Sequence, residues 1–200
     1  MLVSPGRSAA SALSAGLVAL ALTATGCVGQ NAVSATGDGS GYVAGSGTVR
    51  RYAEGHRRAA PTVRGATLEG TTLDLSTYRG HVVVLNFWAS WCPPCRDEAA
   101  GLAQVERDTA ARGVRFVGVN FKDDVDNARI FTQRRQIPYP SLFDRYGQIM
   151  VRFSASVPPA AIPTTLILDR SGRIAASIYG PVTFTRLAPL VTSVAAERSA

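Results

Sequence analysis

The sequence predicts an α/β fold in which helices flank both faces of a central mixed β-sheet. Two buried-strand patterns, at residues 82–88 and 114–121, alternate with two helical patterns, an order that implies parallel pairing through right-handed crossovers. A β-hairpin pattern and a last amphipathic helix follow, so part of the sheet is expected to be antiparallel. The 200 residues suffice for one domain of roughly 120 to 150 residues with additional segments.

Residues 1–26 are typical of a secretory signal, with Arg7 near the start and an apolar or small-residue run at 9–23. This run is short and alanine-rich for a membrane span. Small residues directly before Cys27 resemble the lipobox of bacterial lipoproteins, although Ala24 stands where the lipobox prefers leucine. The resemblance implies a lipidated Cys27 on the extracytoplasmic face of the cell membrane. Ordinary cleavage near this point and an uncleaved anchor are the alternatives, and each also exports the protein to where disulfides persist.

Residues 28–60 are rich in glycine, serine, alanine and asparagine and carry few large apolar side chains. Such a composition does not bury enough surface to offset the entropy of ordering. We therefore expect residues 27–60 to form the lipidated N-terminus and a disordered tether, with a root-mean-square reach of roughly 30 Å. The folded domain is expected to span residues 61–200.

Each element of this domain follows from a local pattern. Alternating polarity around Glu69-Gly70 predicts a hairpin at 62–75 that extends the fold at its N-terminus. Leu102, Val105 and Thr109 form an apolar stripe on a helix from Pro93 to about residue 111. The remaining patterns predict, in chain order, a turn at 76–80, a helix capped by Asp124 or Asp126 and ending near 136, a break at 137–140, a helical piece at 145–153, a strand at 164–168, a hairpin turn at 169–172, a strand at 173–179 and a helix at 183–198.

The stretch 82–95, VVVLNFWASWCPPC, carries the chemistry, because a buried strand delivers Cys92 and Cys95 to the start of a helix. Free backbone N–H groups and the partial positive charge at a helix N-terminus favour a thiolate, which is the nucleophilic form of cysteine. At helix positions i and i+3 the two sulfurs lie on one face, close enough to bridge. Proline costs little in the first helical turn.

Other uses of a Cys-x-x-Cys pair fit less well. A zinc site needs two more ligands, and Cys27, His56 and His81 are poorly placed to supply them. Covalent haem attachment needs histidine directly after the second cysteine, where Arg96 stands. A structural bridge that closes so small a loop constrains the unfolded chain little. A redox dithiol without a metal or other cofactor is the favoured interpretation.

The net charge of +7 comes almost entirely from arginine, since Lys122 is the only lysine. The arginines are scattered and interleaved with acidic residues, whereas a nucleic-acid surface would carry a denser basic stripe. We therefore expect no nucleic-acid partner, and at most a weak attraction of the pairs at 50–58 to anionic lipid.

Two motifs carry a family resemblance. Residues 86–95, NFWASWCPPC, together with Ile162-Pro163-Thr-Thr before a strand, resemble a thioredoxin fold. More narrowly, they are similar to the membrane-tethered thiol–disulfide oxidoreductases of the TlpA/ResA/DsbE type. The segment 68–80, LEGTTLDLSTYRG, also matches the N-terminal hairpin of that family, so the resemblance covers about residues 62–198.

The resemblance implies roles for individual residues. Cys92 would be the exposed attacking thiolate and Cys95 the more buried resolving thiol. Pro163 would be a cis-proline that faces the dithiol, so that the backbone of Ile162 pairs with an extended substrate strand. Trp91 would shield the sulfurs.

A buried carboxylate of thioredoxin is replaced here by Asn86. The TlpA/ResA branch also has a neutral residue there and uses a carboxylate after the next strand, which makes Asp123 the candidate for proton handling near Cys95. A solvated loop acid is the alternative role for Asp123.

The implied reaction is thiol–disulfide exchange with exported proteins, apocytochrome c among them, by a monomer that a membrane thiol–disulfide electron carrier recharges. Reduction is favoured over an oxidative folding role. A peroxiredoxin-type peroxidase would carry a Pro-x-x-x-Thr-x-x-Cys loop, which this chain lacks. A copper-delivery protein would have a wider cysteine spacing and a distant histidine. An interaction module with a vestigial dithiol is the remaining alternative.

Overall fold

The computed structural model describes residues 47–158 and 160–197. Its main sheet has the strand order β1-β8-β7-β4-β5-β6, and a separate two-stranded sheet pairs β2 with β3. The elements are, in chain order, β1 (Thr48–Arg51), η1 (Glu54–His56), β2 (Arg64–Ala66), β3 (Thr72–Asp74), η2 (Leu75–Tyr78), β4 (Val82–Trp88), α1 (Pro93–Thr109), η3 (Ala110–Arg112), β5 (Val114–Phe121), α2 (Val125–Arg134), β6 (Ser141–Asp144), α3 (Gln148–Arg152), β7 (Thr164–Leu168), β8 (Ile174–Tyr179) and α4 (Phe184–Ala195).

The predicted mixed sheet is confirmed. β4, β5 and β6 are parallel neighbours, whereas β7 is antiparallel to β4 and β8 is antiparallel to β7. Each parallel connection passes through a helix, as the alternation of patterns requires. The carboxyl end of β4, where the dithiol follows, therefore lies beside the carboxyl end of β5.

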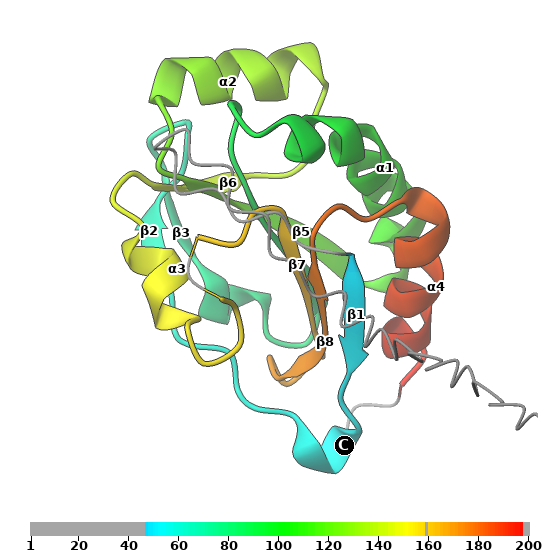
Figure 1. Ribbon diagram of the computed structural model, residues 1–200. Helices are drawn as coiled ribbons and strands as arrows, with labels where there is room; N and C mark the ends of the chain where they lie inside the picture. Colours follow the sequence, from blue (N-terminus) through cyan, green and yellow to red (C-terminus); the bar gives the residue numbers. More distant parts are fainter. Residues whose placement is uncertain (1–46, 159, 198–200) are drawn as a thin grey trace, which may run out of the picture. The chain divides into compact units, whose positions relative to one another are not determined.

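β4 is buried along its whole length because both of its faces are covered. Val82 and Val84 pack with α1 and α4 on one face, and Val83, Leu85 and Phe87 pack on the other. Figure 1 shows α1 and α4 together on one side of the sheet, with α3 and the β2–β3 hairpin on the opposite side. This arrangement explains the unbroken apolar run that the sequence shows at 82–85.

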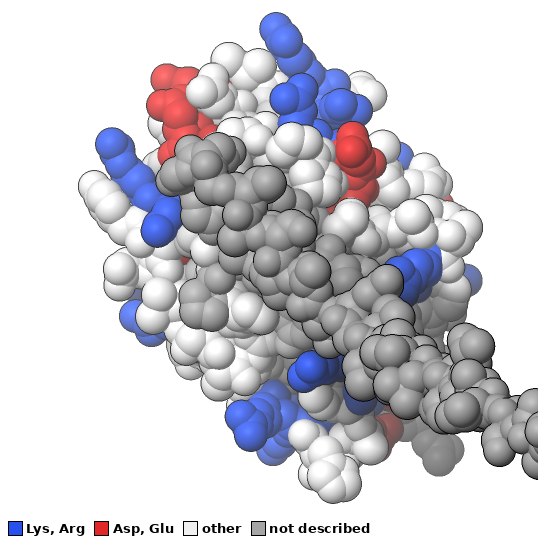
Figure 2. Space-filling view, in the orientation of Figure 1, with Lys and Arg blue, Asp and Glu red and all other residues white. Residues whose placement is uncertain are grey.

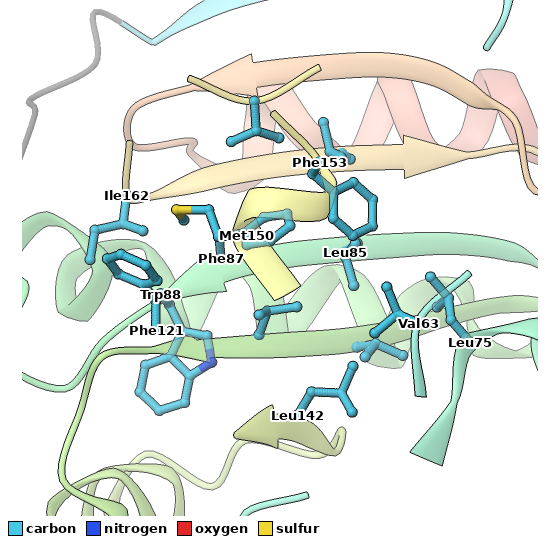
Figure 3. Close-up of a cluster of buried hydrophobic side chains, with 14 of the residues drawn as sticks. Val63, Leu75, Leu85, Phe87, Trp88, Phe121, Leu142, Met150, Phe153 and Ile162 are labelled. Atoms are coloured by element: carbon cyan, nitrogen blue, oxygen red, sulfur yellow. The ribbon is translucent and has the colours of Figure 1, made fainter. Parts of the chain in front are cut away.

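The core cluster on the face of β4 opposite α1 and α4 surrounds two aromatic rings. Phe87 of β4 and Phe153, just after α3, meet edge to face with ring centroids 5.3 Å apart. Figure 3 shows Met150 and Phe153 over the strands, with Ile162 at one end of the labelled cluster. The same cluster includes Cys92 and Cys95, so the redox pair is part of the core.

The predicted N-terminal hairpin is present as β2 and β3. It covers the outer edge of β6, where the Leu68 amide donates to the Ser141 carbonyl at 2.9 Å and Thr67 bridges to Leu142. An uncovered strand edge is a template for aggregation. The hairpin therefore closes one side of the sheet.

The prediction of a disordered tether up to residue 60 is wrong for residues 48–60. β1 pairs with β8 over four residues, and the Arg57 guanidinium, almost fully buried, forms ion pairs with Asp169 at 3.1 Å and Glu197 at 2.7 Å. Residues 48–60 therefore belong to the folded domain together with those from 61 onward. An edge strand gains its stability from pairing with its partner strand, and amino-acid composition does not indicate this pairing. The predicted signal, Cys27 and the first part of the tether lie outside the described residues.

Three smaller differences concern the loops. β6 was not predicted, because four residues after Pro140 carry too little periodicity. The helical piece expected at 145–153 is shorter, and the turn expected at 76–80 contains the short helix η2. Asp124 is the cap of α2, since its Oδ1 accepts from two amides of the first turn at 3.0 Å. In the described ranges, no helix combines the length and apolar character needed to cross a membrane.

Candidate active site

The dithiol lies where β4 turns into α1. The Cys92 amide donates to the Ala89 carbonyl at 3.3 Å, which closes a turn over Ser90 and Trp91. Cys92 is the N-cap of α1, and its Sγ accepts from the Cys95 amide at 3.3 Å. The two cysteines form a disulfide with a Cα–Cα distance of 5.3 Å. The predicted placement of both sulfurs at a helix start is confirmed.

The expected exposure of Cys92 is wrong for this disulfide form. Cys92 has 0% of its surface exposed and Cys95 has 3%. Both belong to the apolar cluster that contains Ile162 and Trp88. A disulfide carries no charge, so it packs among apolar groups without the desolvation cost of a thiolate. Helix position distinguishes the two sulfurs instead, because the Cys92 Sγ receives the free amide of the first turn.

Pro163 lies at the same sheet edge as the dithiol. The Ile162–Pro163 bond is cis, as the resemblance implied, and β7 begins at the next residue. Thr164 of β7 is the register partner of Phe87 in β4, which places Pro163 near the end of β4. Among the described residues, the backbone of Ile162 has no hydrogen-bond partner. Ile162 itself is 0% exposed, so its unpartnered amide and carbonyl are covered in this structure.

Trp91 lies in the turn before Cys92 and Asp123 binds that turn, and neither side chain forms a hydrogen bond with a sulfur. The half-exposed Trp91 donates its indole N–H to the Lys122 carbonyl at 3.1 Å. Asp123 accepts from the Ser90 amide at 2.6 Å and the Ser90 hydroxyl at 2.8 Å. The structure therefore brings Asp123 to the dithiol loop, at Ser90.

Glu98 is the residue that sequence reasoning missed. It lies one helical turn after Cys95, so the two side chains share a face of α1, and only 5% of its surface is exposed. Its Oε1 accepts from the Asn86 side-chain amide at 2.8 Å and its Oε2 from the Val182 amide at 2.9 Å. Burial raises the pKa of Glu98 to about 8, against the opposing effect of these two hydrogen bonds.

A sequence signal for Glu98 did exist. Positions 95, 98, 99 and 102 form the buried stripe of α1, so an acid at 98 interrupts an otherwise apolar face. Its position near the helix start by itself indicates only a favourable interaction with the helix dipole. Asn86 connects the group further, because its amide also donates to the Thr165 hydroxyl at 3.1 Å. The neutral residue on the central strand thus holds a carboxyl that comes from the helix.

On the face drawn in Figure 2, lysine and arginine side chains lie in separate groups among uncharged atoms. Within residues 47–158 and 160–197, no group of three histidine, cysteine, aspartate or glutamate side chains is arranged to hold a metal ion.

Comparison with known proteins identifies the family. The sequence model of the AhpC/TSA family matches residues 57–177, which is more than half of the chain. The chain belongs to the AhpC/TSA family. The thiol:disulfide interchange protein HelX of Rhodobacter capsulatus is 37% identical over 130 residues, which cover 63% of this chain and 69% of that protein. The thiol-disulfide oxidoreductase ResA of Geobacillus thermodenitrificans is 31% identical over 124 residues, covering 62% and 69%.

Solved structures agree with this assignment. A secreted thiol-disulfide isomerase from Corynebacterium glutamicum superposes with a TM-score of 0.71 at 32% identity, covering 74% of this chain and 92% of that one. A DsbF homologue from Corynebacterium diphtheriae gives a TM-score of 0.69 at 33% identity, covering 73% and 92%. This AhpC/TSA family member is therefore a thiol–disulfide oxidoreductase with a thioredoxin-like fold, as its two motifs suggested.

Proposed function

We propose that this oxidoreductase reduces disulfides in exported proteins, with Cys92 as the attacking thiolate and Cys95 as the resolving thiol. The hydrogen bond from the Cys95 amide to the Cys92 Sγ carries the assignment, because it places one sulfur where a helix N-terminus stabilises negative charge. In the reduced protein the same amide would hold the Cys92 thiolate.

The exchange proceeds in two displacements. The Cys92 thiolate attacks one sulfur of the substrate disulfide, and the other substrate sulfur leaves as a thiolate. Cys95 loses its proton and attacks the Cys92 sulfur of this mixed disulfide, which releases the second substrate thiolate. Two electrons have then passed to the substrate, and Cys92 and Cys95 are joined by a disulfide.

Glu98 is mostly protonated near pH 7, and its ionised form, which gains population as the pH approaches about 8, is the proposed proton acceptor for Cys95. The two residues are one turn apart on the same helix face, and burial raises the pKa of Glu98 to about 8, close to the ordinary value of a thiol near 8.5. Such a match allows the proton to move in either direction, which exchange requires. Asp123 is less suited to this role, because its hydrogen bonds go to Ser90, Asn120 and Asp124, whereas Glu98 shares a helix face with Cys95.

Substrates and partners follow from the family. Apocytochrome c is the proposed substrate class, and a membrane thiol–disulfide carrier the proposed electron donor. The backbone of Ile162 beside the cis-Pro163 makes no hydrogen bond, and its pairing with an extended segment would require the covered Ile162 to become accessible. A monomer is sufficient, since Cys92, Cys95, Glu98 and Pro163 all come from one chain.

A lipid anchor at Cys27 is proposed for the location at the extracytoplasmic face. The chain enters the domain at Thr48, whose register partner Tyr179 also pairs with Thr164 of β7. Thr164 in turn pairs with Phe87, near the end of β4. Thr48, where an N-terminal anchor would connect to the domain, therefore lies at the same end of the strands as the dithiol.

An oxidative or isomerising role is the second candidate, because one structural neighbour at 32% identity is described as a secreted thiol-disulfide isomerase. Redox titration against glutathione separates the two directions. A potential near about −270 mV supports a reductant, and one near about −120 mV supports an oxidant.

Two serine variants test the exchange itself. Cys92→Ser is expected to abolish reduction of insulin disulfides, whereas Cys95→Ser is expected to accumulate the mixed disulfide. Equal activity of Cys92→Ser and the parent protein would remove this sulfur from the mechanism. Peroxide consumption by the purified protein would instead favour a peroxidase.

A further inference from the structure

The turn that delivers Cys92 is held from outside. Its two central residues are Ser90 and Trp91, and both bind to the loop after β5. Asp123 accepts the Ser90 amide at its Oδ2 and the Ser90 hydroxyl at its Oδ1, while the Lys122 carbonyl accepts the Trp91 indole. Three hydrogen bonds therefore join this turn to a segment more than thirty residues away in sequence.

The loop after β5 is itself anchored on three sides. The Lys122 amide donates to the Asp144 carbonyl of β6 at 3.0 Å. The Asn120 side chain, fully buried in β5, donates to the Asp123 Oδ2 at 2.8 Å. The Asp124 amide donates to the Asp123 Oδ1 at 2.9 Å, and Asp124 caps α2. Asp123 thus joins the dithiol turn to β5 and α2 through four hydrogen bonds.

We propose that Asp123 is a positioning residue of the dithiol, an inference that rests on the proposed function of Cys92. Together with the Lys122 carbonyl, Asp123 holds the Ala89–Cys92 turn so that Cys92 stays at the N-terminus of α1 after the disulfide is reduced. In the disulfide form the bond to Cys95 already fixes Cys92. In the dithiol form that bond is gone, and Cys92 is then held by the turn on one side and by the hydrogen bond from the Arg96 amide to the Cys92 carbonyl on the other.

The effect of this positioning has a definite sign. If the turn loosens, the Cys92 thiolate loses part of its contact with the helix N-terminus, and its pKa rises. We expect a rise of about one pH unit, which is a tenfold lower thiolate fraction below the pKa. Simple removal of a nearby negative charge acts in the opposite direction, because it favours the thiolate.

Two substitutions separate hydrogen bonding from charge. Asp123→Ala removes all four hydrogen bonds and the charge. Asp123→Asn removes the charge but keeps three bonds, since the amide oxygen replaces Oδ2 and the Ser90 hydroxyl turns to accept from the new NH₂ group. Asp126→Ala is the matched control, because it removes an exposed carboxylate of α2 that pairs with Arg129 instead.

The experiment uses the full chain, reduced, and measures the rate of Cys92 alkylation by iodoacetamide between pH 4 and 10. Insulin reduction is measured in parallel, and a thermal unfolding curve shows that each variant is folded. We expect the acidity constant of Cys92 to fall about tenfold for Asp123→Ala, which is a pKa rise of about one pH unit, to stay within about a factor of three for Asp123→Asn, and to be unchanged for Asp126→Ala.

Other results overturn the proposal in distinguishable ways. A lower Cys92 pKa in both Asp123 variants means that Asp123 acts only through its charge. An unchanged pKa with equal loss of insulin reduction in both variants means that it transfers a proton. Failure of the proposed function would give a different result. The parent protein would then not reduce insulin, although the pKa of its Cys92 could still be measured.

Discussion

Glu98 should make this protein less stable as the pH rises from about 5 to 8. Its pKa is raised from an ordinary value of 4.5 to about 8 because α1 buries the carboxyl beside Asn86 and the Val182 amide. Between these two values the folded state holds a proton that the unfolded chain has released. The free energy of unfolding therefore falls as pH increases, by up to about 1.4 kcal/mol per pH unit. Below pH 4.5 both states are protonated and the shift has no effect.

The total change follows from the same two values. A shift of about 3.5 pH units corresponds to roughly 5 kcal/mol at pH 9, as an upper value. Glu98→Gln removes this titration and keeps most of the packing. Its amide oxygen can accept from the Val182 amide, and the Asn86 side chain can turn so that its oxygen accepts from the new NH₂ group.

Urea denaturation of the disulfide form, at pH values from 5 to 9, measures the effect without titration of the cysteines. The difference between the parent protein and Glu98→Gln cancels the groups that both share. We expect the variant to gain several kcal/mol relative to the parent between pH 5 and 9. Asp97→Asn, an exposed neighbour on α1, should leave the pH dependence unchanged. Parallel curves for the parent and Glu98→Gln would refute the assignment of a neutral buried carboxyl.

Three further predictions concern the frame of the site. Gly118→Ala should lower the free energy of unfolding by about 1 to 3 kcal/mol in urea denaturation, because a Cβ there would collide with the Ser141 hydroxyl and lie 2.8 Å from the Trp88 Nε1. Adding Ser141→Gly should restore part of this loss. A Gly118→Ala variant as stable as the parent protein would contradict the tight packing. Arg57→Met should lower the free energy of unfolding by about 3 kcal/mol, because it removes the ion pairs with Asp169 and Glu197. Arg58 is exposed, so Arg58→Met should change this free energy little. Equal losses in the two variants would contradict a specific contribution of Arg57. A chain that starts at residue 61 lacks β1, which covers the edge of β8. Compared with a chain that starts at residue 47, it should unfold at a lower temperature and self-associate more in sedimentation. Identical behaviour of the two chains would show that β1 is dispensable.

Much of the fold could be predicted because its signals are local. The apolar run at 82–88, the apolar stripe of α1 and the cap at Asp124 each specify an element without reference to the rest of the chain. β1 and β6 could not be found this way. Each has four residues and lies at or near a sheet edge, where pairing with a longer neighbour supplies the stability that the segment lacks.

The same division holds for the site. The sequence by itself determined the redox pair and its place at a helix start, because spacing along the chain sets both, whereas the place of Pro163 beside the dithiol was implied only by the family resemblance. Only the tertiary structure decided that Glu98 is neutral near pH 7, that Cys92 is covered in the disulfide form, and that Asp123 binds Ser90. Burial and long-range hydrogen bonds depend on which segments meet in space, and these contacts have no pattern along the chain.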